Sequence, residues 1–170
     1  GSIPPSIGQL STLTNLDLSG NQLSGPIPPS IGQLSALTWL DLRNNQLSGP
    51  IPPWIGQLSA LTILYLWEDQ LSGPIPECIG QLSALKVLDI RGRRFSGPIP
   101  PSIGQLSALT SLFLRGGQLS GAHCLKMRSS REKLQVDSAT RRQDTCEQDL
   151  QYIQLDHRTA GSHPAVDRSA

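Results

Sequence analysis

Leucine and isoleucine alternate with polar residues in this chain in a pattern that repeats every 24 residues. Residues 37–60 read LTWLDLRNNQLSGPIPPWIGQLSA, and residues 61–84 repeat the pattern as LTILYLWEDQLSGPIPECIGQLSA. Complete units begin at residues 13, 37, 61 and 85; a fifth begins at 109 and ends at 121, and residues 1–12 match the second half of a unit. A period of this length predicts a solenoid, in which each coil packs against its neighbours.

Each unit opens with the pattern LxxLxL, which predicts a short strand whose leucines lie on one face. The second complete unit has Leu37, Leu40 and Leu42 at these positions. We expect successive strands to stack in parallel into one sheet, with the leucines directed inward. Further inward positions follow in each unit, and they are Leu23, Leu47, Leu71, Phe95 and Leu119, then Ile27, Ile51, Ile75 and Ile99, then Ile31 and Leu34 with their equivalents. No coil can bury about seven apolar side chains by itself, so neighbouring coils must cover them.

The Gly-Pro-Ile-Pro-Pro stretch of each unit cannot be helical, because proline lacks a backbone donor and restricts the residue before it. We expect it to run extended, with a glycine easing the turn that leads into it. The PPSIGQLSA segment that follows is short and interrupted by glycine. It supports at most a single 3₁₀ turn.

A polar residue occupies the position that follows the strand pattern. Asn21 and Asn45 stand there in the first two complete units, where a buried amide can bond to the backbone of adjacent coils. Asp69, Arg93 and Gly117 take the same position later in the chain. Because arginine is too long and too polar to be buried unpaired, we expect looser packing towards the fourth and fifth units, or a sequence that drifts there without selection for stability.

The solvent-facing positions of the predicted strands vary, whereas the framework hardly changes. Three columns run across the sheet, namely Asn15, Trp39, Ile63, Val87 and Ser111; Asp17, Asp41, Tyr65, Asp89 and Phe113; and Ser19, Arg43, Trp67, Arg91 and Arg115. Four of the seven aromatic residues of the chain fall here, and Trp, Tyr and Arg are enriched at interface hot spots. The predicted partner-binding residues are Trp39, Asp41, Arg43, Tyr65, Trp67, Asp89, Arg91, Phe113 and Arg115. The alternative is that these rings and arginines only pack against one another across the strands.

Catalytic chemistry is not indicated by any motif. The repeats contain no nucleophile elbow, no phosphate loop and no paired carboxylates. Asp17, Asp41 and Asp89 share one column, but they lie a strand or more apart, and we expect a solvated acidic stripe. The three cysteines, Cys78, Cys124 and Cys146, form no CxxC pair and match no zinc-site spacing. We therefore predict a protein that is not an enzyme and that uses no cofactor and no metal.

A fourth variable position lies on the turn opposite the predicted sheet. Trp54 and Cys78 occupy it in two units, and Ser30 and Ser102 occupy it in two others. We expect these side chains to be exposed. Trp54 could then mark a second contact, and Cys78 would be a free thiol.

The composition changes abruptly after Gly121. Residues 122–170 contain no repeat, few apolar residues and more than half of the charged residues of the chain. Such a segment gains too little from burial to offset its ordering entropy, so we expect it to be mostly disordered or weakly helical. Apolar residues at helical spacing in 144–156 would allow a helix that covers the last coil. A read-through or out-of-frame product is the other interpretation of this segment.

The charges of the chain also restrict the class of partner. The 14 basic and 13 acidic residues nearly cancel, so no electrostatic footprint for nucleic acid is present. No apolar run approaches the roughly 18 residues of a membrane span. A protein or a peptide is therefore the expected partner, and the sequence does not indicate an oligomeric state.

The motif LxxLxLxxNxLSGxIPxxIGxL resembles the plant-type leucine-rich repeat, over residues 13–121 with 1–12 as a partial copy. The resemblance implies an α/β leucine-rich repeat fold that is mostly strand and coil. This would be a right-handed solenoid or horseshoe with a parallel concave sheet, second short strands at LSGPIP and 3₁₀ turns. The chain starts in mid-repeat, without the paired-cysteine cap that normally precedes such repeats, so we expect a fragment. Nothing in it resembles a kinase domain.

Plant-type leucine-rich repeats occur in receptor-like kinases, in receptor-like proteins and in inhibitors of cell-wall-degrading enzymes. Their shared role is the recognition of peptides, hormones or other proteins. The resemblance thus implies a module that binds a protein or peptide with its concave face, in a receptor-like or secreted recognition protein. It would then be extracellular or at the cell surface. The alternative is an intracellular scaffold array that belongs to a larger signalling protein.

Overall fold

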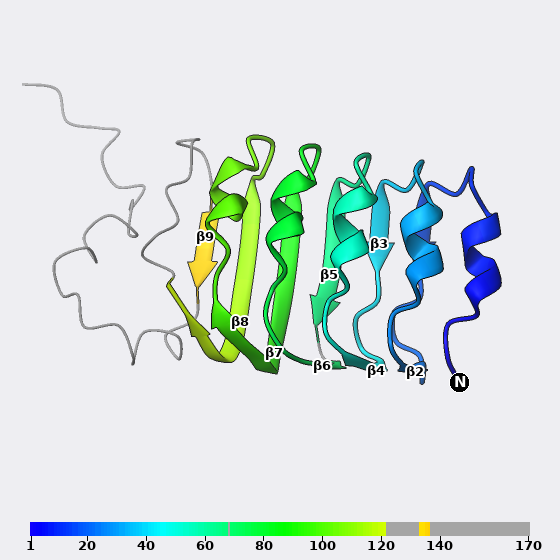
Figure 1. The fold of residues 1–170 in the computed structure, drawn as a ribbon, viewed down its shortest axis with the longest axis horizontal. Coiled ribbons are helices and arrows are strands. Elements are labelled where there is room, and N and C mark those ends of the chain that lie inside the picture. Colours follow the sequence, from blue (N-terminus) through cyan, green and yellow to red (C-terminus); the bar gives the residue numbers. More distant parts are fainter. Residues whose placement is uncertain (68, 122–132, 137–170) are drawn as a thin grey trace, which may run out of the picture.

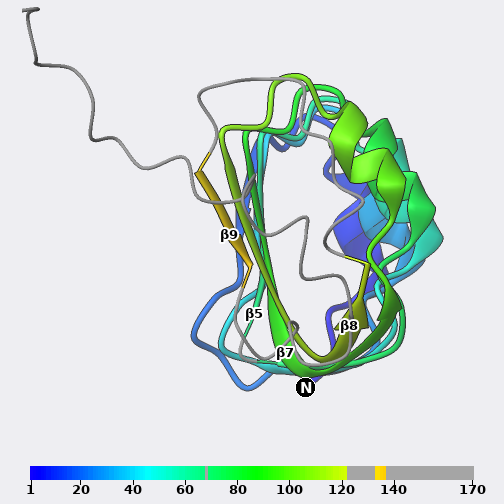
Figure 2. The same cartoon turned by 90° about the vertical axis from the view of Figure 1, so that its left-hand side faces the viewer.

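The computed structural model describes residues 1–67, 69–121 and 133–136, which form a stack of similar coils (Figure 1). Each full coil contributes a strand to one long parallel sheet and a 3₁₀ helix to the opposite side. Figure 2 looks along the stack and shows the long sheet on one side and the 3₁₀ helices on the other, with connecting segments that join the two sides. The described residues contain no α-helix, in agreement with the mostly strand and coil structure expected.

The elements repeat in the same order along the chain. The main sheet has the order β1-β3-β5-β7-β8-β9 and consists of β1 (Asn15–Asp17), β3 (Trp39–Asp41), β5 (Ile63–Trp67), β7 (Val87–Pro98), β8 (Ser111–Ser120) and β9 (Lys133–Val136). A second, shorter sheet at the LSG segments consists of β2 (Ser24–Gly25), β4 (Gln46–Gly49) and β6 (Gln70–Leu71). The 3₁₀ helices are η1 (Pro5–Gln9), η2 (Pro29–Gln33), η3 (Pro53–Gln57), η4 (Glu77–Gln81) and η5 (Pro101–Gln105).

The register of the main sheet places equivalent residues of neighbouring coils side by side. Leu16 pairs with Leu40, Leu40 with Leu64 and Leu64 with Leu88, each 24 residues apart. Every position of the repeat therefore forms a column along the stack. A residue in one coil lies beside the residue at the same position in the next coil.

The inward columns form one continuous apolar core, as the pattern predicts. Leu40, Leu64 and Leu88 are fully buried, and so are Ile55 and Leu58 on the side of the 3₁₀ helices. At the amino-terminal end the first coil is covered less completely, and the partly buried side chains there are Ile7, Leu13, Leu18 and Leu23. Burial in the middle of the stack thus depends on a coil on each side.

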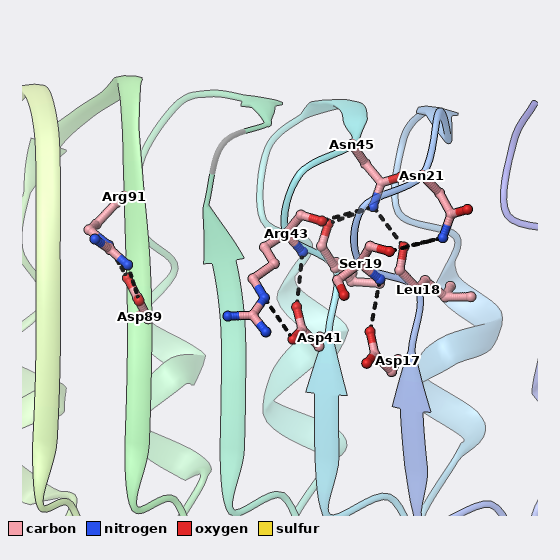
Figure 3. A network of polar contacts seen from close by, with 10 residues as sticks. Asp17, Leu18, Ser19, Asn21, Asp41, Arg43, Asn45, Asp89 and Arg91 are labelled. Carbon is pink, nitrogen blue, oxygen red and sulfur yellow. Dashed lines mark hydrogen bonds and ion pairs between the residues drawn. The ribbon is translucent and has the colours of Figure 1, made fainter.

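Asn45 joins three neighbouring coils by hydrogen bonds. Its Nδ2 donates to the carbonyl oxygens of Leu42 and Arg43 in its own coil and of Leu18 in the preceding one, at 3.0, 3.2 and 2.9 Å (Figure 3). Its Oδ1 accepts from the N–H of Leu23, and its own N–H donates to Asp69 in the next coil. The predicted role of the buried amide is confirmed here. Asn21, by contrast, is exposed and donates only within its own coil.

Asp69 stands in the same column, but a carboxylate cannot donate as the amide does. Its Oδ1 accepts from the N–H groups of Asn45 and Leu47 at 3.1 and 3.2 Å. Its Oδ2 is buried and has no hydrogen-bond partner among the described residues. Burial raises the pKa of Asp69 to about 6, against the lowering effect of the two N–H donors. The folded coil therefore favours a protonated carboxyl, which can donate as asparagine does.

The fourth and fifth coils do not show the looser packing that we expected. β7 and β8 run unbroken for 12 and 10 residues and pair directly, with a register shift between Gly92 and Ser96. Arg93 turns out to solvent, while Phe95 and Leu119 are 1% and 3% exposed. Backbone pairing thus replaces the amide. A Cβ at Gly117 would lie 2.3 Å from the carbonyl oxygen of Arg93, so this close approach requires glycine.

The expected exposure of the turn column opposite the sheet is wrong in part. Trp54 and Cys78 are half-buried against the core, and Ser30 is buried. Ser102 donates from Oγ to the carbonyl oxygen of Glu77 in the preceding coil at 2.8 Å. The 3₁₀ helices stack so closely that this column lies between coils.

Residues 133–136 are the part of the 122–170 segment that the structure describes. They form β9, which pairs in parallel with β8 and adds a sixth strand to the main sheet. The sequence pattern predicts no strand there. The helix expected in 144–156 and the disorder expected for the rest lie outside the described residues.

Asn45→Ala tests the hydrogen bonds between coils. It removes bonds to buried backbone groups, so we expect the free energy of unfolding to fall by on the order of 3 kcal/mol. Asn21→Ala is the matched control: the same change at an exposed site should cost less than about 1 kcal/mol. Urea unfolding followed by circular dichroism measures both, and equal losses would contradict the role assigned to Asn45.

Asp69→Asn tests the protonation of the buried carboxyl. A pKa raised from 3.8 to about 6 means that the folded chain holds this proton more tightly than the unfolded chain. The bound proton of Asp69 makes its full contribution to the stability of the fold below about pH 4, and this contribution is lost as the pH rises through 6. The asparagine side chain of the variant keeps an amide donor at every pH. The variant should therefore gain stability over the parent between pH 4 and pH 7, by at most about 3 kcal/mol.

Unfolding of the parent and of the variant at several pH values measures this gain. Asp17→Asn is the control, because Asp17 is exposed and its pKa is lowered by hydrogen bonds from Ser19. A difference between Asp69→Asn and the parent that does not change with pH would rule out the assignment.

Candidate functional site

The nine predicted partner-binding residues lie together on the outer side of the main sheet, which we call the concave face. Eight of them lie on β3, β5, β7 and β8, and Arg43 follows two residues after the end of β3; the parallel register sets their order. Tyr65 lies between Asp41 and Asp89, and Trp67 pairs with Arg91, which in turn pairs with Arg115. Because side chains alternate along a strand, residues two apart share this face.

Aromatic rings and guanidinium groups form a continuous band across the four strands. Trp39 meets Tyr65 edge to face, with ring centroids 5.9 Å apart. The Arg43 Cζ lies 5.0 Å from the Tyr65 centroid and 5.5 Å from that of Trp67. Arg91 continues the band, with its Cζ 4.6 Å from Trp67 and 5.7 Å from Phe113. These contacts are cation–π interactions, and they include the packing across strands that the sequence allowed as the alternative.

The expected solvated acidic stripe is wrong for two of its three members. Asp41 and Asp89 are 0% and 3% exposed, whereas Asp17 at the edge of the sheet is exposed. The register places Asp89 between the rings of Tyr65 and Phe113, and it places Tyr65 on one side of Asp41. The bulky neighbours exclude water from both carboxylates.

Each buried carboxylate pairs with the arginine two residues further along the chain (Figure 3). Arg91 donates from Nε and Nη2 to the two oxygens of Asp89, each at 2.6 Å. Arg43 Nε lies 2.9 Å from Asp41 Oδ2 in an ion pair, although its N–H does not point along a hydrogen bond. The N–H of Arg43 donates to Asp41 Oδ1 at 3.2 Å.

Burial raises the pKa of Asp41, against the lowering effects of the N–H and the guanidinium of Arg43. The arginine side chains remain 35% exposed at Arg43 and 41% exposed at Arg91, and Arg115 is exposed. The concave face therefore presents cations and aromatic rings to solvent and keeps two of its acids underneath. It is suited to bind polar or acidic groups next to flat apolar ones.

Sequence reasoning placed these residues on one face but missed the ion pairs. The signal was present as Asp-x-Arg in two coils, Asp41 with Arg43 and Asp89 with Arg91. A spacing of two along a strand puts both side chains on the same face within reach of each other. Arg93 and Arg94, which are exposed just beyond this face, were not singled out as binding residues either.

Metal binding and membrane crossing find no candidate in the described part of the chain. No group of three or more His, Cys, Asp or Glu side chains there could hold a metal ion. Among the same residues, no helix has the length and apolar character needed to cross a bilayer.

The fold and the repeated motif define a leucine-rich repeat solenoid, and comparison with known proteins specifies its type. The family described as leucine rich repeat matches residues 1–47, and again residues 84–106. No curated protein sequence matches the chain. The ectodomain of the Arabidopsis thaliana receptor kinase SOBIR1 is 38% identical with a TM-score of 0.67, over 71% of this chain and 67% of that one. The chain belongs to the plant-type leucine-rich repeat family.

Two longer receptors are similar as well. The Arabidopsis receptor kinase HAESA, solved with the peptide hormone IDA and the co-receptor SERK1, is 37% identical with a TM-score of 0.70, over 81% of this chain and 24% of that one. PEPR1, solved with AtPEP1, is 38% identical with a TM-score of 0.72, over 81% of this chain and 19% of that one. The chain thus spans about a fifth of the length of PEPR1.

Asp89→Ala tests whether the buried ion pair holds the concave face together. The change leaves Arg91 without its bidentate partner, but the guanidinium is partly solvated, so we expect a loss of about 1–2 kcal/mol in the free energy of unfolding. Asp17→Ala in the same column is the control and should cost less than about 0.5 kcal/mol. Chemical denaturation measures the free energy of unfolding of both variants. A loss of stability for Asp89→Ala no larger than that of the control would contradict the role of the pair.

Proposed function

We propose that the chain is a recognition module that binds a peptide or a protein segment with its concave face. The observation that carries the proposal is the band formed by Trp39, Tyr65, Trp67, Arg43 and Arg91. It presents large aromatic surfaces beside fixed cations, the residue types enriched at binding hot spots. Its side chains are already held in place before a partner arrives, which reduces the entropy lost on binding.

The similar proteins support this use of the fold. HAESA was solved with a peptide hormone, and RGFR1 is a plant peptide hormone receptor solved in complex with RGF2. RGFR1 is 32% identical with a TM-score of 0.63, over 81% of this chain. By analogy we propose that the chain is part of a receptor-like or secreted recognition protein at the cell surface or outside the cell. An intracellular scaffold array is less favoured, because these neighbours are receptors and receptor-kinase ectodomains.

The size of the described sheet also suits a peptide. Six parallel strands at the usual spacing span about 24 Å across the concave face. An extended peptide of about seven residues covers that distance. We further infer that the chain is not an enzyme, since the concave face offers arginines and rings but keeps two of its carboxylates buried in ion pairs.

Replacing Trp39, Tyr65 and Trp67 together by alanine tests the concave face. Binders are first selected for the full chain from a random peptide library displayed on phage. Their affinity for the triple variant should fall by several kcal/mol, because the anchoring rings are gone, while the fold is retained.

Trp54→Ala is the matched control, since it removes an aromatic ring from the opposite side of the solenoid. It should leave the affinities unchanged. A library that yields no binder would overturn the proposed function. If the selected peptides bind the triple variant as tightly as the full chain but bind Trp54→Ala more weakly, the binding site lies on the side of the 3₁₀ helices.

A further inference from the structure

The concave face has an asymmetry of charge that its formal composition hides. The three outward columns, which run along the main sheet and just past the ends of its shorter strands, contain three aspartates and three arginines. Asp41 and Asp89 lie beneath the surface, whereas Arg43 and Arg91 stay more than a third exposed. Arg115 follows them in register on β8 and is exposed. A partner that approaches this side of the described sheet meets a row of cations, which favours an acidic ligand.

Two of these cations are fixed in position on either side of one ring. Arg43 and Arg91 each hold a buried aspartate below and lie over Trp67. Their Cζ atoms are 5.5 and 4.6 Å from the Trp67 centroid, so they are at most about 10 Å apart. The strands agree with this separation, because β3 and β7 flank β5 at two strand spacings, about 9.6 Å.

A separation close to these two strand spacings matches one backbone conformation for a peptide that crosses the strands. A polyproline II helix rises about 3.1 Å per residue and has three residues per turn, so side chains three apart point the same way about 9.3 Å apart. In a β-strand, residues three apart span about 10 Å but point to opposite sides, and residues two apart span only about 7 Å. Of these two extended forms, the polyproline II form places two side chains on Arg43 and Arg91 together.

We propose that the concave face binds a proline-containing acidic peptide in the polyproline II conformation. Two carboxylates three residues apart bind Arg43 and Arg91, and the residues between them contact the outer edge of the Trp67 ring, because the two guanidiniums lie over its faces. Proline suits the middle positions, because it is already restricted to this conformation and its apolar ring can pack against the edge of an indole. The inference rests on the proposed function and adds the chemistry, spacing and conformation of the ligand.

Synthetic peptides containing Asp-Pro-Pro-Asp, acetylated and amidated to remove terminal charges, test the proposal on the full chain. We expect them to bind at least tenfold more tightly than Asn-Pro-Pro-Asn, because both ion pairs are lost with the amides. Asp-Pro-Asp should also bind at least tenfold more weakly, since its acids are two residues apart. Asp-Gly-Gly-Asp should bind severalfold more weakly, because it is not held in the conformation.

Isothermal titration calorimetry gives these affinities, and the affinity of Asp-Pro-Pro-Asp should fall as salt is added. These comparisons change only the peptide, so they do not depend on any variant folding. Equal affinity for Asp-Pro-Pro-Asp and Asn-Pro-Pro-Asn, or for Asp-Pro-Pro-Asp and Asp-Pro-Asp, would overturn the proposal.

A variant of the protein locates the site. Asp41→Asn with Arg43→Gln removes one ion pair as a unit and leaves the net charge unchanged, so no buried carboxylate is left without its cation. It should weaken Asp-Pro-Pro-Asp at least tenfold. Lys86→Gln is the control: it removes one exposed cation just before β7, five residues from Arg91, and should change the affinity less than twofold. A loss of affinity for Lys86→Gln without a loss for the double variant would show attraction by net charge alone, and either that result or equal losses for the two variants would overturn the site.

The experiments distinguish failure of the proposed ligand chemistry from failure of the proposed recognition function. If Asp-Pro-Pro-Asp does not bind but the phage library yields peptides that the triple alanine variant rejects, the ligand chemistry proposed here is wrong and the recognition function stands. If neither the designed peptides nor the library bind, both are wrong.

Discussion

The coils of this solenoid are stable only when they stack in register. A single coil has about seven inward apolar side chains and no interior of its own, so it becomes buried only when a coil with the same pattern lies on each side. The 24-residue period meets this requirement, because it places Leu40 beside Leu64 and Leu64 beside Leu88. The same register then aligns every other position, including the polar ones, into columns.

The column of Asn45 shows that, in a stack of coils, backbone groups of one coil can depend on a side chain of the next coil for their hydrogen bonds. The chain turns after each strand, and backbone groups of neighbouring coils are left without strand partners there. Asn45 both donates to and accepts from them, Asp69 can only accept once it is ionised, and the fourth and fifth coils avoid the need by continuing the strand. The solenoid thus uses two ways of satisfying the backbone, and the carboxyl of Asp69 at the junction between them has a raised pKa.

The concave face is a consequence of the same columns. Asp41 and Asp89 are buried because rings from neighbouring coils flank them, and the arginines that neutralise them are held against those rings. Packing within the free protein and binding of a partner are therefore compatible. The contacts that hold Arg43 and Arg91 also fix the distance between them, which is what a ligand of defined spacing requires.

Features that depend on one coil and its copies could be read from the sequence. The period, the inward leucines, the non-helical proline segment and the membership of the concave face all follow from local alternation and repetition. Features that depend on how far side chains reach from one coil to the next emerged only once the chain was folded. These include the burial of Asp41 and Asp89, the half-burial of Trp54, and the unbroken strands around Arg93. The pairing of β9 is another such feature, because residues 133–136 carry no repeat pattern and pair with the edge of β8.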